Sequence, residues 1–261
     1  MAAALAALLA LAACGAAGCG SDSSGSASAP SAEPSLTLTD CQGNIYKVVE
    51  IGGRYWMAEN LRCTQYDSLS ERAGAELTAS GPSSYAPYCT DGRGAESSTS
   101  AFLASEHRAK LGLLYNWAAA MGYASEAEAQ AQTGDYDGDR QGICPNGWHL
   151  PSRAEWTALN DYAASQDTAV SVGKRFKSAA GWYVGDGSVG NGTDAYGFAA
   201  LPAGDALGST VFGAGEWTNF WSSGANGPTD AYFRHLHMSN DDFREWSNFK
   251  DDGLSVRCVR D

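Results

Sequence analysis

The chain of 261 residues carries a formal net charge of −13 at pH 7, and 18% of its residues are charged. A partner with a phosphate backbone demands clustered Lys and Arg, so this acidic composition argues against nucleic acid as a partner. Aromatic residues make up 11% of the chain, which supplies enough apolar surface for a sizeable core.

The N-terminus has the pattern of a bacterial export signal. Residues 1–13 are almost wholly Ala and Leu, form an apolar run too short to span a bilayer, and end in small residues directly before Cys14. We predict a lipoprotein signal peptide over residues 1–14, with the lipid on Cys14 or, as a second candidate, on Cys19. An ordinary secretory signal is the alternative, and the lack of Lys or Arg before the apolar run departs from the usual pattern.

A low-complexity segment follows the signal. Residues 15–35 consist mainly of Ser, Gly, Ala and Pro, a composition that cannot bury enough apolar surface to order itself. We therefore predict a flexible tether, followed by one domain over residues 36–261. The expected location is the bacterial outer membrane or cell surface, with the lipid anchor as the only part in the membrane.

The domain is expected to begin with a β-hairpin over residues 44–57. β-Branched residues at 45–51 are followed by the two-residue turn of Gly52 and Gly53 and by a short aromatic return strand. Residues 64–105 show no clear periodicity and predict a long irregular insertion.

Helices are predicted in the middle of the chain. Apolar residues at helical spacing predict one near residues 109–121, and an Ala-, Glu- and Gln-rich segment at 125–132 predicts a short one. The clearest helix start is Ser152-x-x-Glu155, a capping box in which each residue satisfies a backbone N–H of the other. The helix that follows carries an apolar stripe of Trp156, Leu159 and Ala163.

The pattern changes after Ala163. Short apolar runs alternate with Gly, Asn and Asp turns, which indicates several short strands joined by long loops. The sequence therefore predicts an α+β domain with two helices and a small irregular antiparallel sheet.

Six sequence blocks occur in order along the chain. They are GNIYKVVEIGGRYWMAENLR at 43–62, LGLLYNW at 111–117, QGICPNGWHLPSRAEWTAL at 141–159, NGTDAYGFAALPAG at 191–204, FWSS at 220–223 and GLSVRCVRD at 253–261. Together they resemble the Fibrobacter succinogenes major paralogous domain family. The resemblance implies a C-type-lectin-like α+β fold, similar also to formylglycine-generating enzymes, with long loops that carry ligand contacts. It implies an exported lipoprotein and no particular activity.

The blocks closest to this family contain Cys144 and Cys258, and we predict a disulfide between them. Closing such a long loop would contribute about 3–5 kcal/mol to stability, whereas two buried free thiols are the alternative. Cys63 and Cys89 are a weaker second pair, which would leave Cys41 unpaired. No CxxC is present, which disfavours zinc ribbons and thioredoxin-like sites.

Two motifs suggest metal ligands. Asp135, Asp137 and Asp139 alternate along the chain, and their oxygens are ligands that calcium prefers. The Gly and Glu positions of an EF-hand loop are not matched, so a solvated acidic turn is the alternative. His235-x-His237 would be half of a zinc site, without a visible third ligand. By contrast, His149 is expected to be a buried, hydrogen-bonded core residue.

The segment 231–248 mixes aromatic, amide and charged residues, which binding surfaces favour. In lectin-like folds this position often lies on the ligand face, although an ordinary polar hairpin and loop fits equally well. The candidate ligand-binding residues are Tyr232, Arg234, His235, His237, Asn240 and Trp246.

Catalysis has little support in the sequence. The chain lacks the serine-elbow, HExxH, phosphate-loop and dinucleotide-binding patterns, and its tail has Cys258 alone where formylglycine-generating enzymes use two cysteines. We expect no enzyme but a lipid-anchored surface module that binds a carbohydrate or an extracellular protein through loops within residues 205–250. The rivals are an exported glycan-acting enzyme with two carboxylates in one cleft, and an envelope scaffold or adhesion protein without a small ligand.

Overall fold

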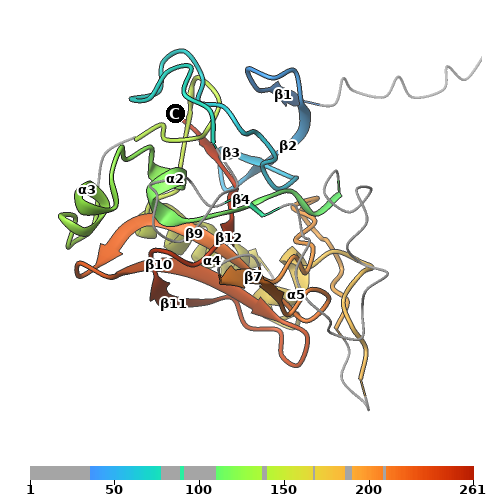
Figure 1. Ribbon diagram of the computed structural model, residues 1–261. Coiled ribbons are helices and arrows are strands. Elements are labelled where there is room, and N and C mark those ends of the chain that lie inside the picture. The colour runs from blue at the N-terminus through green and yellow to red at the C-terminus, as the bar shows by residue number, and fades with distance from the viewer. Residues whose placement is uncertain are drawn as a thin grey trace, which may run out of the picture. The chain divides into compact units, whose positions relative to one another are not determined.

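Strands in three sheets make up most of the regular structure in the computed structural model (Figure 1). The structure describes residues 36–77, 89–90, 110–136, 140–166, 168–185, 190–207 and 210–261. The predicted signal and tether, with Cys14 and Cys19, lie outside these ranges. None of the helices within them has the length and hydrophobicity needed to cross a bilayer.

The first sheet joins the start of the described chain to its last strand. In spatial order it contains β1 (Thr37–Thr39), β2 (Ile45–Ile51), β3 (Arg54–Met57), β13 (Val259–Arg260) and β6 (Trp148–His149). The predicted hairpin is confirmed as β2 and β3. Gly52 and Gly53 both have positive φ, +63° and +79°, which a two-residue hairpin turn matching the strand twist requires.

The second sheet is larger and contains the longest strands. In spatial order it contains β11 (Arg244–Phe249), β10 (Asp230–His237), β9 (Trp217–Asn226), β12 (Leu254–Ser255), β5 (Leu114–Tyr115) and β4 (Cys89–Thr90). Figure 1 shows β9, β10 and β11 as a broad ribbon of adjacent strands. The third sheet pairs β7 (Asp205–Leu207) with β8 (Thr210–Phe212).

The prediction of a two-helix, C-type-lectin-like α+β domain is wrong, because the domain is mostly β. Within the described ranges the helices are α2 (Trp117–Met121), α3 (Glu126–Gln130), α4 (Arg153–Gln166) and α5 (Val172–Phe176). Of these, α4 is the one long helix, with 14 residues, and the other three have five residues each.

The helix predicted near residues 109–121 shows why. Gly112 has φ +79°, so the backbone leaves the helical conformation at this point, and a Cβ there would lie 2.5 Å from the Cβ of Asn60, so only glycine fits. The chain then forms β5, and α2 starts only after Asn116, whose side chain accepts a hydrogen bond from the Ala119 N–H at 2.8 Å. The apolar spacing that predicts one helix therefore serves a strand and a single helical turn.

The capping box before α4 is confirmed. The Glu155 N–H donates to Ser152 Oγ at 3.2 Å, and the Ser152 N–H donates to Glu155 Oε2 at 2.8 Å. The predicted stripe of α4 is buried against β9, where the indole of Trp156 stacks on Phe220 with ring centroids 5.9 Å apart. The helix α4 is therefore fastened to the second sheet by apolar packing behind a defined start.

His149 is the buried, hydrogen-bonded residue that we predicted. Its Nδ1 lies 2.7 Å from Asp261 Oδ1 and its Nε2 lies 3.0 Å from Glu155 Oε1. The imidazole thus links the last residues of the described chain to the start of α4.

Glu155 is expected to make stability depend on pH. Burial alone would raise its pKa, but hydrogen bonds from His149 and Ser152 outweigh it and lower the pKa to about 2 from 4.5. The group therefore stabilises the fold fully above pH 4.5, by on the order of 3 kcal/mol, and this contribution is lost as the pH falls towards 2. In urea unfolding at a series of pH values, Glu155→Gln should lower the free energy of unfolding at pH 7 by about 2–3 kcal/mol. It should also flatten the dependence between pH 4.5 and 2.

The matched control is Glu126→Gln in the first turn of α3, where the side chain is exposed. This substitution should change the free energy of unfolding by less than about 0.5 kcal/mol. Equal losses from both variants at pH 7 would contradict the specific role of Glu155.

Candidate functional site

Four rings line up on one face of β9, β10 and β11. The ring centroids of Trp217 and His237 are 6.1 Å apart, those of His237 and His235 are 5.8 Å apart, and those of His235 and Trp246 are 4.5 Å apart. We call these four side chains the indole–imidazole row. Strand geometry produces it, because alternate residues share a face and because Trp217 lies directly opposite His237 in the pairing of β9 with β10.

Hydrogen bonds assign opposite tautomers to the two imidazoles of the row. Asn219 Nδ2 donates to Asp205 Oδ2 at 3.1 Å, so Asn219 Oδ1 accepts from His235 Nδ1 at 2.7 Å and His235 keeps Nε2 as an acceptor. In His237, Nδ1 accepts from the Ser239 N–H at 3.0 Å, so Nε2 carries the proton and is a donor. The two imidazoles therefore differ in tautomer: His235, which is 7% exposed, keeps an acceptor at Nε2, and the half-buried His237 keeps a donor at Nε2.

Both imidazoles are neutral at pH 7. Burial is the main cause that lowers the pKa of His235 to about 4, and the nearby His237, Arg244 and Lys177 lower it further. Burial also lowers the pKa of His237, with Lys177 acting in the same direction and Glu216 opposing it. The row is thus an uncharged group of rings on an acidic protein, in which His235 is buried and Trp246 is exposed.

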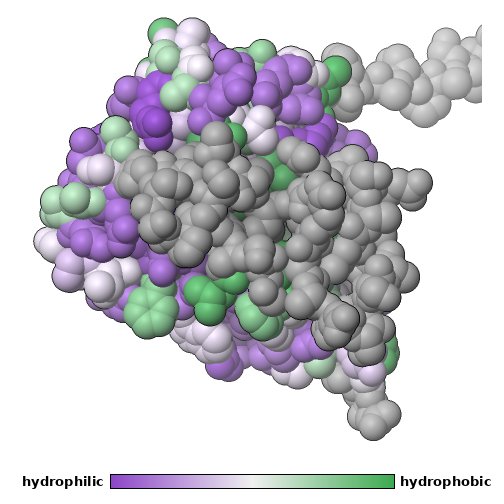
Figure 2. Space-filling view, in the orientation of Figure 1, coloured by the Kyte–Doolittle hydropathy of each residue, from purple (hydrophilic) through white to green (hydrophobic). Residues whose placement is uncertain are grey.

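Trp246 is the accessible end of the row. Its side chain lies on β11 and is 48% exposed, although it stacks on His235 with an angle of 17° between the rings. In Figure 2, a few hydrophobic residues are visible among hydrophilic ones along the lower edge of the face shown. Because half of this indole is exposed while its ring is fixed by stacking, Trp246 contributes little to the core and is available to contact a ligand.

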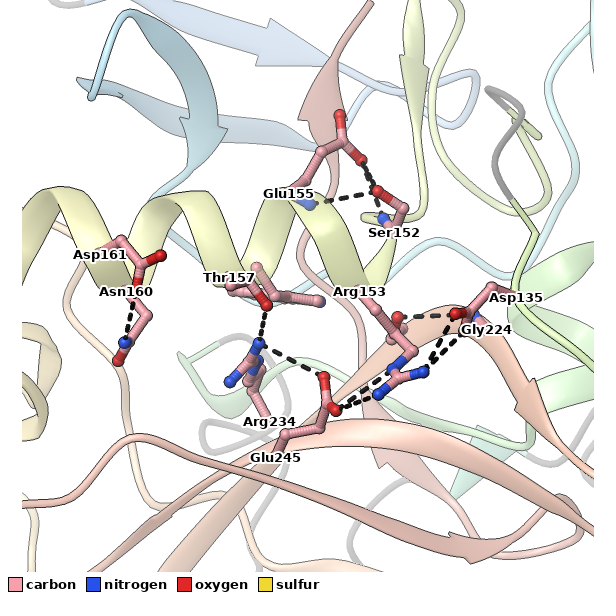
Figure 3. A network of polar contacts seen from close by, with 12 residues as sticks. Asp135, Ser152, Arg153, Glu155, Thr157, Asn160, Asp161, Gly224, Arg234 and Glu245 are labelled. Atoms are coloured by element: carbon pink, nitrogen blue, oxygen red, sulfur yellow. Dashed lines mark hydrogen bonds and ion pairs between the residues drawn. The ribbon is translucent and has the colours of Figure 1, made fainter.

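The opposite face of the same strands carries a polar network beneath α4 (Figure 3). Arg153 of α4 donates to Glu245 at 2.6 Å and to both carboxylate oxygens of Asp135 at 3.0 Å. Its guanidinium also lies 3.6 Å from the ring centroid of Tyr232. Arg234 Nη2 donates to Thr157 Oγ1 of α4 at 2.7 Å. The predicted ligand-binding residues Tyr232 and Arg234 thus lie on the helix-covered face, away from the row.

A model of the Fibrobacter succinogenes major domain matches residues 49–260 of the chain. The chain belongs to the Fibrobacter succinogenes major domain family. The match includes the whole indole–imidazole row and the start of α4. Among curated proteins and among solved structures, none matches the chain significantly.

In this Fibrobacter succinogenes major domain, Cys144 and Cys258 form the predicted disulfide. Both residues are fully buried, and the bond ties the loop before α4 to the segment before β13. The link therefore holds the C-terminal strand, and with it the first sheet, close to the helix that supports the second sheet.

The predicted calcium ligands are only partly visible in the domain. The carboxylate of Asp135 pairs with Arg153, whereas Asp137 and Asp139 lie outside the described residues. Within the part of the chain that the structure describes, no group of three or more His, Cys, Asp or Glu side chains is arranged to hold a metal ion. Calcium at this loop stays a prediction.

Asn240 lies in the turn after β10, where its carbonyl accepts from Lys177 Nζ at 2.6 Å. Of the six predicted ligand-binding residues, the domain brings three together in the row: His235, His237 and Trp246. Sequence reasoning missed Trp217 and Asn219 on β9. The alternation of residues 217, 219 and 221 in the segment WTNFW is the signal that places them on one face.

Proposed function

We propose that the chain is a binding module that holds a neutral carbohydrate on the indole–imidazole row. The observation that carries this proposal is the exposed indole of Trp246, stacked on an imidazole whose tautomer is defined by hydrogen bonds. The apolar C–H face of a sugar ring packs against such a flat aromatic surface, which offers rigid contact area at a low cost in conformational entropy.

The polar groups of the row are suited to the hydroxyl groups of a sugar. Each sugar hydroxyl both donates and accepts a hydrogen bond, so it suits a site that offers one acceptor and one donor side by side. His237 Nε2–H supplies the donor, and the acceptor is Nε2 of His235, whose side chain is 7% exposed; both Nδ1 atoms are already used within the protein. Precisely oriented polar groups beside an aromatic surface are the usual composition of a small-ligand site.

Charge favours a neutral ligand over an anionic one. The two imidazoles are uncharged at pH 7, and the formal net charge of −13 repels anions at long range. The cations near His235 are already paired, Arg244 with Asp242 and Lys177 with Asp241. We therefore expect uncharged hexose- or pentose-containing glycans rather than uronic or sulfated ones.

We further propose that the module is exported and anchored by a lipid on Cys14, or on Cys19. The apolar run before Cys14 supports this, as does the disulfide, because such bonds persist in oxidising compartments. The mass of the N-terminal peptide of the mature protein, purified from membranes, identifies the modified cysteine. A mature chain without a lipid would contradict the anchoring proposal and leave the proposal of glycan binding unaffected.

The test of binding is a printed glycan array, followed by affinity measurement on the strongest neutral hit. Trp246→Ala should weaken binding about tenfold or more, since stacking on an aromatic side chain contributes on the order of 1–2 kcal/mol. Phe249→Ala is the matched control. Phe249 is an exposed ring on the same strand, 59% exposed, but it lies three residues on and therefore on the other face.

The outcomes separate the alternatives. Binding that is lost with a chelator and with Asp137→Ala would move the site from the row to the acidic loop. Equal losses in Trp246→Ala and Phe249→Ala would contradict a site on one face. An array without hits would replace the glycan by a protein ligand or a scaffold role, and turnover of a bound glycan would favour the glycan-acting enzyme.

A further inference from the structure

Two thiols approach each other on the side of the domain formed by the first sheet. Cys41 Sγ and Cys63 Sγ are 3.9 Å apart, although 22 positions separate them in sequence. Cys41 is exposed in the turn between β1 and β2, whereas Cys63, beyond β3, is 1% exposed. One thiol is thus open to a reagent and the other is enclosed directly behind it.

The backbone around the two thiols is held together on both sides. Gln42 and Thr64 form a reciprocal pair: the Thr64 N–H donates to Gln42 Oε1 at 2.8 Å, and Gln42 Nε2 donates to Thr64 Oγ1 at 2.9 Å. Asp40 orders the same turn by accepting from the N–H groups of Gln42 and Asn44, both at 2.9 Å. These hydrogen bonds therefore hold the two segments in positions that keep the sulfur atoms close together.

Both thiols point towards one acceptor. Cys63 Sγ donates to the Gln65 carbonyl at 3.0 Å, and Cys41 Sγ lies 3.4 Å from the same oxygen. Burial raises the pKa of both thiols, and Asp67 and Asp40 raise that of Cys41 further, so both are mostly protonated at pH 7. This environment does not suit a catalytic nucleophile or a metal ligand, which requires a largely deprotonated sulfur, whereas disulfide exchange proceeds through the small thiolate fraction.

We propose that Cys41 and Cys63 form a second disulfide in the oxidised protein. Closing the gap from 3.9 Å to a bonded distance of about 2.0 Å requires a shift of the exposed Cys41 side chain. The disulfide already present at Cys144 shows that this chain carries oxidised cysteines. The competing pairing of Cys63 with Cys89 would leave unpaired Cys41, whose sulfur lies next to that of Cys63.

A dithiol–disulfide exchange forms the bond, with a low-molecular-weight disulfide such as oxidised glutathione as the oxidant. The Cys41 thiolate, after losing its proton to water, attacks one glutathione sulfur and releases one glutathione thiolate. The Cys63 thiolate then displaces the second glutathione from Cys41. Two protein thiols are oxidised, one glutathione disulfide is reduced, and two glutathiones leave.

Peptide mapping of the unreduced, alkylated full chain tests the pairing directly. Trypsin together with an Asp-specific protease places the three cysteines on the separate peptides 40–47, 63–66 and 73–90. The expected result is a linked pair of 40–47 with 63–66, and the Cys144–Cys258 pair is the internal control for preserved disulfides. A link between 63–66 and 73–90, or alkylated Cys41 and Cys63 after incubation with oxidised glutathione, would overturn the proposal.

The variant Cys41→Ser provides a second readout, because it changes an exposed side chain and leaves the buried thiol in place. A bond across 22 positions should raise Tm by about 10 °C relative to this variant under oxidising conditions. The difference should disappear in dithiothreitol. Equal Tm values for the two proteins without reductant would contradict the second disulfide.

Discussion

Removal of the Cys144–Cys258 disulfide is expected to lower the free energy of unfolding by about 5 kcal/mol, since the bond closes a loop across 114 positions. The bond excludes the extended arrangements of that long loop from the unfolded chain. A typical domain has about 5–15 kcal/mol of stability, so the loss should leave the protein partly unfolded at 37 °C. Guanidinium unfolding of Cys144→Ala/Cys258→Ala measures it.

The variants are best compared in a protein that also carries Cys41→Ser, because the proposed second disulfide cannot form there and only the loss of Cys144–Cys258 is measured. Its reduced form lacks the bond but keeps both sulfur atoms, whereas the double alanine variant lacks both bond and sulfurs. Similar losses in the two forms would assign the effect to loop closure, and a larger loss in the alanine variant would measure the cavities left in the core. A loss below about 1 kcal/mol in both would contradict the role of the bond.

Features that depend on a few neighbouring residues could be predicted from the sequence. The hairpin turn at Gly52 and Gly53 requires positive φ, and the capping box of Ser152 and Glu155 is complete within four residues. In each case the chemistry that selects the structure lies in the local segment. Both were confirmed.

The fold class could not be predicted, because it depends on contacts between distant segments. At Gly112 the chain lies against Asn60, about fifty positions earlier, and no local sequence pattern predicts this contact. Likewise β12 and β13 each contain two residues, too few to leave a periodic pattern, yet they connect the last segment to both large sheets. The extent of the sheets was therefore underestimated.

The candidate site shows the same division. Residue type drew attention to His235, His237 and Trp246, but only the pairing of strands decides which neighbours share their face. The register adds Trp217 to the row and assigns Tyr232 to the polar network below α4. The alternation of residues along β9 would have placed Trp217 and Asn219 on one face, but it could not have shown that this face is shared with His235 and His237.

Arg257 lies between β12 of the second sheet and β13 of the first, so its loss should destabilise both large sheets. It is 0% exposed, and its guanidinium donates to Asn60 Oδ1 at 2.6 Å and to the carbonyls of Met57, Phe198 and Ala199 at 3.0, 2.6 and 3.1 Å. Burial lowers its pKa to about 9, a sign of how costly the removal of this cation from water is, and Glu59 and Asp194 oppose the shift. The hydrogen bonds compensate for that cost.

Arg257→Met is expected to lower the free energy of unfolding by about 3–5 kcal/mol, because three buried oxygen acceptors and one half-buried acceptor lose their donor. Arg257→Lys should lose less, since an ammonium keeps the charge but cannot reach all four acceptors in the planar geometry of a guanidinium. Urea unfolding followed by tryptophan fluorescence measures both.

Arg260→Met is the matched control, because this arginine lies only three positions further along, is exposed, and contacts the ring of Tyr55 at 5.4 Å. Its loss should remain below about 1 kcal/mol. The outcome against this account is an Arg257→Met variant as stable as the native chain. The burial of the cation would then cost as much as its hydrogen bonds return, as happens for some buried ion pairs. Apolar packing, the disulfide and hydrogen bonds such as that from the Leu61 N–H to the Val256 carbonyl would then connect the two sheets.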